Sequence, residues 1–321
     1  MKAAVLHAFG EAPHYEEFPD PVAEQGEQMV TVKAASLTTI SKAWAIGSHY
    51  DGYKQLPVVC GLDGVGVLEN GTRIYTGGSR QPFGMMAERT IVRQSFGASI
   101  PDAVDDVTAA ALPNPALSSW LPLAYRAQLK PGETVFILGA TGIAGKLAIQ
   151  IAKHLGAGRI IAAGRNRTRL EALREIGADS VVPLDLPDSA LTDTLVREAL
   201  TQRFDVILDY IWGHPAEVLI NALTGHDTMA ENARIRYISI GSMAGPTAAV
   251  PSAALRSSGL ELYGSGGGSV SYSAIFETFP KLWALAAEGN LTIETQAIPL
   301  ADVEQAWGQQ DTAGRRMVFI P

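Results

Sequence analysis

A glycine-rich turn between a strand-like run and a helix-like run is the segment of this chain best suited to chemistry. The turn, Gly139 to Gly145, follows the apolar run Thr134 to Leu138 and precedes a helical pattern from Lys146 to Leu155. A second apolar run begins at Arg159. Strand, glycine turn, helix and strand in this order are typical of a dinucleotide-binding site. Bare backbone can approach a pyrophosphate closely, and the helix N-terminus directs free N–H groups and a positive dipole end at that anion.

The turn departs at one position from the pattern G-x-G-x-x-G. Ala140 stands where the first glycine is expected, while Gly142 and Gly145 supply the second and third. A glycine triplet is also compatible with a tight turn that binds nothing, and this alternative stays open. The residues that we expect to contact the cofactor are Gly139, Ala140, Thr141, Gly142, Ile143 and Ala144.

The end of the second predicted strand indicates which dinucleotide is bound. An acidic residue there would bind a ribose 2′-hydroxyl, but the chain reads Gly164-Arg165-Asn166, Arg169 follows, and no carboxylate occurs before Glu171. Guanidinium groups suit a 2′-phosphate because they form charge-assisted hydrogen bonds with phosphate oxygens. We therefore predict NADPH, held at this end by Gly164, Arg165, Asn166 and Arg169. The alternative is a solvated loop that is merely basic.

Composition limits the other classes of function. The chain has 321 residues and a net charge of −8, which favours two domains and argues against a general nucleic-acid or anionic-membrane binder. Cys60 is the single cysteine, so no intramolecular disulfide can form. The six histidines show no close ligand pair, so we expect no metal. The first residues turn polar too soon for a signal peptide and no apolar run is long enough to span a membrane, so we expect a cytoplasmic protein.

The elements that must position the turn follow two different patterns of predicted secondary structure. Residues 1–100 read as short strands interrupted by glycines and turns, which favours a small barrel or sandwich. After Pro101 we expect helices at 102–112 and 118–129, the second one bent or delayed by Pro122. The strands expected next are 135–138, 160–163, 181–183, 206–208, 236–240 and 260–263. The helices expected between them are 146–155, 168–176, 190–203 and 215–223. This alternation predicts a parallel sheet covered by helices on both faces.

The last residues return to the short-strand pattern of residues 1–100. A helix at 302–307 and a closing strand at 317–320 follow a glycine- and serine-rich stretch at 264–268. We expect this tail to rejoin the first domain, which makes the nucleotide-binding domain an insertion. The predicted domains are therefore 1–112 with 264–321, and 113–263.

Several stations along the chain resemble, in the same order, the medium-chain dehydrogenase/reductase superfamily, in particular its zinc-free NADPH:quinone oxidoreductase-like branch. They are Met1-Lys2-Ala3, Gly61-x-Asp63-Gly64-x-Gly66, Ala87-Glu88 after Gly84, Ala109-Ala110-Ala111, Lys130-Pro131-Gly132-Glu133, the turn at Gly139, Leu208-Asp209, Gly241 and Gly314-Arg315. The resemblance covers essentially the whole chain. Its combined order is more specific than any one motif.

The resemblance implies an α/β fold in which a Rossmann domain with a doubly wound parallel sheet is inserted, near the C-terminal half, in a GroES-like β-barrel domain. It implies metal-free transfer of a hydride from NADPH to a quinone or to the β-carbon of an α,β-unsaturated carbonyl, and it implies homodimers. One segment departs from the family. Thr38 and Ser41 stand where members often carry Asn and Asp, and Ala43 and Ala45 where Tyr and Arg are common. The substrate pocket is therefore expected to be remodelled.

Further site residues follow from strand ends and from the resemblance. Gly241 and Ser242 follow a strand at its carboxyl end, where ligands sit in open α/β sheets, so we expect them at the nicotinamide ribose. The resemblance places Ser118 near the nicotinamide and pyrophosphate, and places Ser265 and Gly266 in a loop that closes over nicotinamide. Thr38 is a candidate donor to the nicotinamide amide or the substrate. The alternatives are a helix N-cap for Ser118, a linker for 265–266 and a satisfied loop hydroxyl for Thr38.

Reduction of an enone or quinone builds negative charge on an oxygen, so a hydrogen-bond donor there lowers the barrier. Tyr50 and Tyr53 lie in the segment that borders the family's pocket, and they are the candidate general acids. Either could instead pack at a domain edge, with solvent supplying the proton. Two other functions stay open: a zinc-independent alcohol or aldehyde dehydrogenase, and a non-catalytic NADPH-binding protein that acts as a sensor or associates with RNA.

Overall fold

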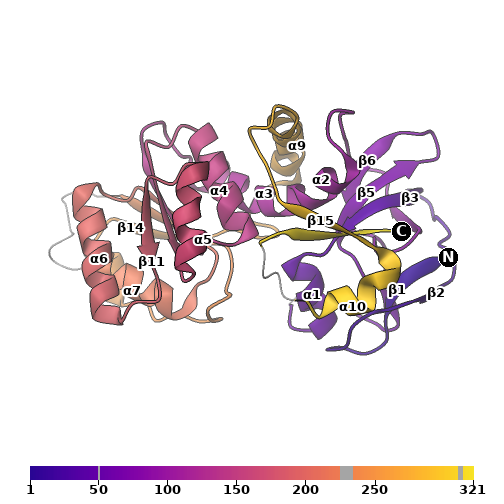
Figure 1. Cartoon of the computed structure of the whole chain (residues 1–321), viewed down its shortest axis with the longest axis horizontal. Helices are drawn as coiled ribbons and strands as arrows, with labels where there is room; N and C mark the ends of the chain where they lie inside the picture. Colours follow the sequence, from indigo (N-terminus) through magenta and orange to yellow (C-terminus); the bar gives the residue numbers. More distant parts are fainter. Residues whose placement is uncertain (50, 225–233, 310–313) are drawn as a thin grey trace. The chain divides into compact units, whose positions relative to one another are not determined.

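The computed structural model describes residues 1–49, 51–224, 234–309 and 314–321 (Figure 1). The chain divides into two compact units: unit 1 contains Met1–Asn114 and Phe279–Pro321, and unit 2 contains Pro115–Thr278. Unit 2 is thus inserted in the sequence of unit 1. The first boundary lies close to the predicted break after residue 112. The second boundary lies between Thr278 and Phe279, inside a helix.

Unit 1 consists mainly of short antiparallel strands. In its described part, one sheet has the strand order β2-β1-β4 and a larger sheet has the order β15-β16-β3-β5-β6-β8, with β7 paired to β3. An isolated bridge joins Ala3 of the small sheet to Ala87. The strands are β1 (Lys2–Leu6), β2 (His14–Glu17), β3 (Glu27–Ser36), β4 (Val58–Val59), β5 (Asp63–Leu68), β6 (Arg73–Gly77), β7 (Arg89–Arg93), β8 (Gly97–Ser99), β15 (Thr295–Pro299) and β16 (Arg316–Ile320). The C-terminal strand therefore joins the N-terminal strands, as the sequence predicts.

Helix α2 (Asp106–Ala111) lies on the larger sheet of unit 1. The Asp105 carboxylate begins the helix by accepting the N–H of Thr108 at 2.9 Å. The buried face consists of Ala109, Ala110 and Ala111, whose small side chains let the helix pack against β3, β5 and β16. The helix starts later than the predicted residue 102 because the cap is Asp105 and not the segment directly after Pro101.

Unit 2 contains a parallel sheet in the order β11-β10-β9-β12-β13-β14. Its strands are β9 (Thr134–Leu138), β10 (Arg159–Gly164), β11 (Ser180–Pro183), β12 (Val206–Asp209), β13 (Ile235–Ser239) and β14 (Leu260–Gly264). The helices that connect its first five strands are α4 (Ile143–His154), α5 (Arg167–Ala172), α6 (Asp188–Thr201) and α7 (Gly213–Leu223). Strands and helices alternate along the chain as the sequence predicts.

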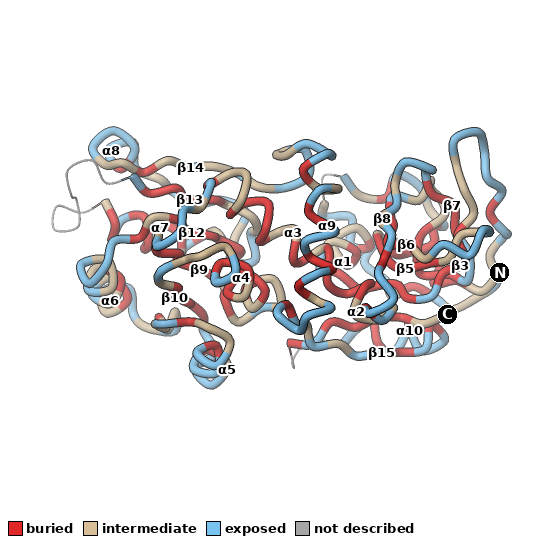
Figure 2. Tube along the Cα trace, turned by 90° about the horizontal axis from the view of Figure 1, so that it is seen from above, coloured by how far each residue is buried: buried red, intermediate tan, exposed pale blue. Residues whose placement is uncertain are grey.

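Alternate residues of β9 show that helices cover both faces of this sheet. Phe136 and Leu138 belong to a buried cluster with residues of α6 and α7, including Leu195 and Leu219. Helix α4, which packs on β9 and β10, is outside that cluster. Buried residues follow the strands of unit 2, while α5 and α6 expose their outer turns (Figure 2). The predicted α/β fold class, with its doubly wound parallel sheet, is confirmed.

Three further helical segments differ from the sequence prediction. Helix α3 (Pro113–Leu121) begins before residue 118, since proline is favoured in a first helical turn, and the short π-helix η1 (Pro122–Ala127) follows it. The chain also forms α1 (Thr39–Ile46) and α9 (Tyr272–Ala287), neither of which the sequence predicts. Pro280 inside α9 hides its helical pattern. Four short elements complete the structure: the helices α8 (Ser252–Arg256) and α10 (Val303–Trp307), and the 3-10 helices η2 (Leu173–Ile176) and η3 (Leu300–Asp302).

Among the described residues, no helix combines the length and the apolar character that a membrane span requires.

Candidate functional site

The glycine turn joins β9 to α4, and its three glycines have different tasks. Gly139 has φ +90°, and a Cβ atom on it would lie 2.8 Å from Cγ2 of Ile211. A Cβ on Gly145 would lie 2.5 Å from Cα of Ala140, so only glycine lets the helix pack this closely on the turn. Gly142 has only the Gly139 carbonyl within reach of a Cβ, at 3.6 Å. The tight bend is therefore made at Gly139, and the alanine at position 140 carries no strain.

The first turn of α4 presents unused N–H donors. Gly142 is its N-cap residue and offers no side chain. Within the described ranges, the N–H groups of Ile143, Ala144 and Gly145 have no acceptor. Because the helix dipole adds a positive partial charge at this end, the turn is suited to an anion such as a pyrophosphate.

This turn lies at the topological switch point of the sheet, where the order of the strands reverses on either side of β9. From β9 the chain proceeds to β10 and β11 on one side and to β12, β13 and β14 on the other. The crevice beyond the carboxyl ends of such strands is where open α/β sheets bind ligands. Ile211, which follows β12, lies beside the backbone of Gly139, so the glycine turn and the loop after β12 border each other.

Asp209 shapes the turn that follows β12. One carboxylate oxygen, Oδ1, accepts the N–H groups of Ile211 and Trp212, both at 2.8 Å, and Oδ2 accepts the hydroxyl of Tyr237 at 2.6 Å. The side chain is fully buried, and burial raises the pKa of the carboxyl above its ordinary value despite these hydrogen bonds. Asp209 therefore orients the loop from within, which agrees with a supporting role and not with contact to a ligand.

The predicted nicotinamide-side residues lie at the ends of β13 and β14. Gly241 donates its N–H to the Asp209 carbonyl at 3.2 Å, and a Cβ on it would lie 2.5 Å from the Tyr210 carbonyl oxygen. Ser242 follows and is exposed. Ser265 donates its N–H to the Ser239 carbonyl at 2.8 Å, and the next residue, Gly266, starts a turn closed by the hydroxyl of Ser269. Because the strands are parallel, these segments lie at the same end of the sheet as the glycine turn.

Two arginines beyond the end of β10 are available to a ligand: Arg165 directly follows the strand, and Arg169 lies in the first turn of α5. Asn166 caps α5 by accepting the Arg169 N–H at 3.0 Å, and Arg167 pairs with Asp185 at 2.9 Å. In the part of the chain that the structure describes, the guanidinium groups of Arg165 and Arg169 have no carboxylate partner and form no hydrogen bond. Gly164 lies close to the glycine turn, since a Cβ on it would meet Cγ2 of Thr141 at 2.6 Å.

Ser118 is neither a helix cap nor free. It lies inside α3, and its hydroxyl donates to the Pro115 carbonyl at 2.8 Å. The neighbouring Ser119, which the sequence did not single out, is fully buried and lies 2.8 Å from the Tyr210 hydroxyl and 3.1 Å from the Ala144 carbonyl. A pair of adjacent serines on a helix is not a recognisable motif, so only the fold reveals this contact.

Of the site residues predicted in unit 1, the structure describes Thr38 and Tyr53. Thr38 is the buried N-cap of α1: its hydroxyl oxygen accepts the Ser41 N–H at 2.9 Å and lies 2.8 Å from the Ser41 hydroxyl. The side chain at position 38 thus has a helix-capping task, and its predicted contact with cofactor or substrate stays a prediction. Tyr50 lies outside the described residues.

Tyr53 is buried with Cys60 in the core of unit 1. Its ring packs edge-on against Trp44, with centroids 5.3 Å apart, and its hydroxyl has no hydrogen-bond partner among the described residues. Burial raises the pKa of the tyrosine well above its ordinary value and raises the pKa of the Cys60 thiol to about 12. Tyr53 therefore keeps its proton at neutral pH and can act as a hydrogen-bond donor.

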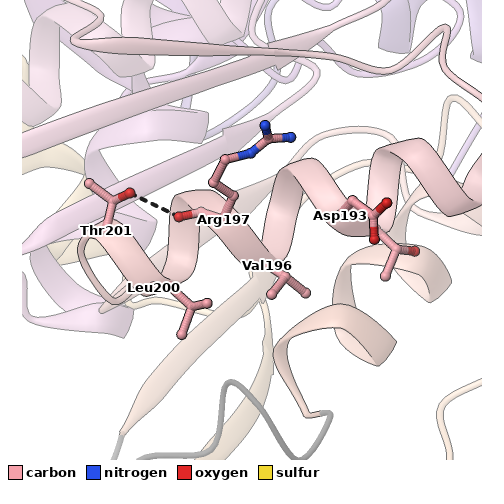
Figure 3. A pocket seen from close by; sticks show the side chains of 6 residues that line it. Asp193, Val196, Arg197, Leu200 and Thr201 are labelled. Carbon is pink, nitrogen blue, oxygen red and sulfur yellow. Dashed lines mark hydrogen bonds between the residues drawn. The ribbon is translucent and has the colours of Figure 1, made fainter.

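In the described residues, no three His, Cys, Asp or Glu side chains gather as a metal site would require. A hollow on α6 is lined by Thr192, Asp193, Val196, Arg197, Leu200 and Thr201 (Figure 3). It contains none of the predicted site residues.

A family model described as zinc-binding dehydrogenase matches residues 144–288. The probable NADPH-dependent quinone reductase tdiC of Emericella nidulans is 27% identical, over 100% of both chains. The chloroplastic NADPH-dependent alkenal/one oxidoreductase of Arabidopsis thaliana is 28% identical over 60% of this chain and 51% of its own length, so the match spans about half of that relative. The quinone oxidoreductase of Thermus thermophilus, whose structures include a complex with NADPH, is 25% identical, with a TM-score of 0.80 and full coverage of both chains.

Proposed function

This chain belongs to the medium-chain dehydrogenase/reductase superfamily, in its quinone-reductase-like branch, and from this premise we propose that it reduces quinones or α,β-unsaturated carbonyls with NADPH and without a metal. The protein is an NADPH-dependent oxidoreductase. The relatives are quinone reductases and an alkenal/one oxidoreductase by name, which supports small carbonyl compounds as substrates.

One observation carries the assignment of the site: groups that can bind anions follow the carboxyl ends of two adjacent strands and have no partner among the described residues. The N–H donors of Ile143, Ala144 and Gly145 would hold the pyrophosphate, and Arg165 and Arg169 would hold the 2′-phosphate. Because these two groups of donors follow the adjacent strands β9 and β10, a single dinucleotide can reach both.

The remaining predicted residues fit the other half of the cofactor. Gly241, Ser242, Ser265 and Gly266 follow β13 and β14, on the opposite side of β9 from Arg165. We propose that these loops border the nicotinamide. When bound, NADPH supplies a hydride from C4 of its ring, and the acceptor takes up one proton.

The proton can come from solvent. Tyr53 is a poor acid because burial raises its pKa, although its hydroxyl remains a candidate donor to a developing oxyanion. The dimer implied by the family also remains a proposal, which light scattering of the purified protein tests.

The direct assay is NADPH oxidation, followed by its absorbance, with 1,4-benzoquinone, 9,10-phenanthrenequinone and a short enone. Turnover with at least one acceptor is expected, and added chelator should leave the rate unchanged. Tight NADPH binding with no turnover would indicate a binding protein instead. Reduction of NADP⁺ by simple alcohols alone would indicate an alcohol dehydrogenase.

A further inference from the structure

Two buried hydroxyls in unit 2 form a short chain of hydrogen bonds that ends on the first turn of α4. Ser119 of α3 is fully buried, and Tyr210, which follows β12, is 9% exposed. Their oxygens lie 2.8 Å apart. The Ser119 hydroxyl also lies 3.1 Å from the carbonyl oxygen of Ala144, and the Tyr210 hydroxyl lies 3.3 Å from the carbonyl oxygen of Ser118. The chain therefore connects α3 and the end of β12 to the glycine turn.

The number of protons decides the direction of these bonds. The two hydroxyls have one proton each, and burial raises the pKa of Tyr210, so the tyrosine stays protonated. When Tyr210 donates to Ser119 or to the Ser118 carbonyl, the Ser119 proton is available for Ala144. The Pro115 carbonyl, at 3.3 Å, competes at a longer distance. The carbonyl of Ala144 is thus the nearer carbonyl acceptor at the end of the chain.

That carbonyl belongs to the same peptide group as the N–H of Gly145. The Gly145 N–H is one of the unused donors of the α4 N-terminus. A hydrogen bond to the carbonyl fixes the plane of this peptide and polarises it, which makes the N–H a stronger donor. We propose that Ser119 and Tyr210 are positioning residues that orient the Gly145 N–H toward the pyrophosphate of NADPH. This inference rests on the proposed binding of NADPH at the glycine turn.

The test compares a ligand that contains the pyrophosphate with one that lacks it. NADPH would contact both the α4 turn and Arg165, whereas adenosine 2′-monophosphate carries only the 2′-phosphate. Ser119→Ala should weaken NADPH by up to about tenfold, the limit reached if the bond from the Gly145 N–H to the charged pyrophosphate is lost entirely, and should leave adenosine 2′-monophosphate unchanged. Arg165→Ala should weaken both ligands.

Tyr210→Phe gives a graded second variant. The Ser119 hydroxyl can still donate to Ala144 without the tyrosine, but its orientation is less fixed, so we expect NADPH binding to weaken by only about threefold. The double variant should behave like Ser119→Ala because both side chains act through one bond. The matched control is Tyr75→Phe, which removes a buried hydroxyl from Asp63 in unit 1 and should lower the melting temperature without changing NADPH affinity.

Two results would overturn the proposal. Ser119→Ala and Tyr210→Phe could weaken both ligands equally, which would indicate general loosening of unit 2, or they could leave NADPH binding unchanged. Wild-type protein that binds adenosine 2′-monophosphate but not NADPH would overturn the proposed function together with this inference. Thermal unfolding of each variant without ligand separates loss of folding from loss of affinity.

Discussion

Removal of Arg165 should reduce the preference for NADPH over NADH and leave only the part of it that Arg169 supplies. The guanidinium follows β10, is exposed, and has no carboxylate partner among the described residues. A hydrogen bond to a charged group contributes about 1.5–3 kcal/mol, and solvent exposure places this one at the lower end. Arg165→Ala should therefore weaken NADPH by roughly tenfold, since about 1.4 kcal/mol corresponds to a factor of ten. NADH lacks the 2′-phosphate and should bind Arg165→Ala and wild type alike.

The assay is titration of each variant with NADPH and NADH at two salt concentrations. Arg167→Ala is the matched control: Arg167 lies two residues further on, at the start of α5, but it already pairs with Asp185. It should leave both affinities nearly unchanged, while higher salt should reduce the advantage of NADPH in wild type. Equal loss of NADH and NADPH in Arg165→Ala, or a loss as large in Arg167→Ala, would refute the reasoning.

Three further outcomes follow from the described contacts. Gly145→Ala should weaken NADPH and lower stability by about 1–3 kcal/mol, because its Cβ would lie 2.5 Å from Cα of Ala140; unchanged melting and affinity would contradict this packing. Asp209→Asn should destabilise less than Asp209→Ala in urea titration, since an amide can still accept the two loop N–H groups and no buried charge remains; the reverse order would contradict the capping role. Native Cys60 should resist iodoacetamide at neutral pH and react after unfolding. Because its folded pKa is raised to about 12, the thiol ionises first in the unfolded chain as the pH rises above about 9, so stability should fall there; fast native labelling would contradict its burial.

The sequence predicts the parallel sheet well because its signals are local. The central strands β9, β10 and β12 are short, mostly apolar runs, and the glycine turn lies between strand and helix as expected. The arginines near position 165 could be singled out because carboxylates are absent over a short stretch of sequence. Such features need no knowledge of distant contacts.

Other features depend on contacts that sequence reasoning could not supply. Ser119 differs from Ser118 only in the direction of its side chain, which α3 turns toward Ala144. Helix α9 contains Pro280, which argues locally against a helix, yet the helix continues through it and Phe279 and Trp283 stack with their ring centroids 6.3 Å apart. Tertiary packing outweighs the local preference there.

The most direct test of the central claim is to follow the hydride itself. The protein is supplied with NADPH deuterated on the transferred position of C4 and with a short enone, and the product is examined by mass spectrometry and NMR. The account predicts a saturated ketone that carries deuterium on its β-carbon. Absence of reduction with every enone and quinone acceptor would contradict it. A saturated ketone formed from the enone without deuterium on its β-carbon would also contradict it.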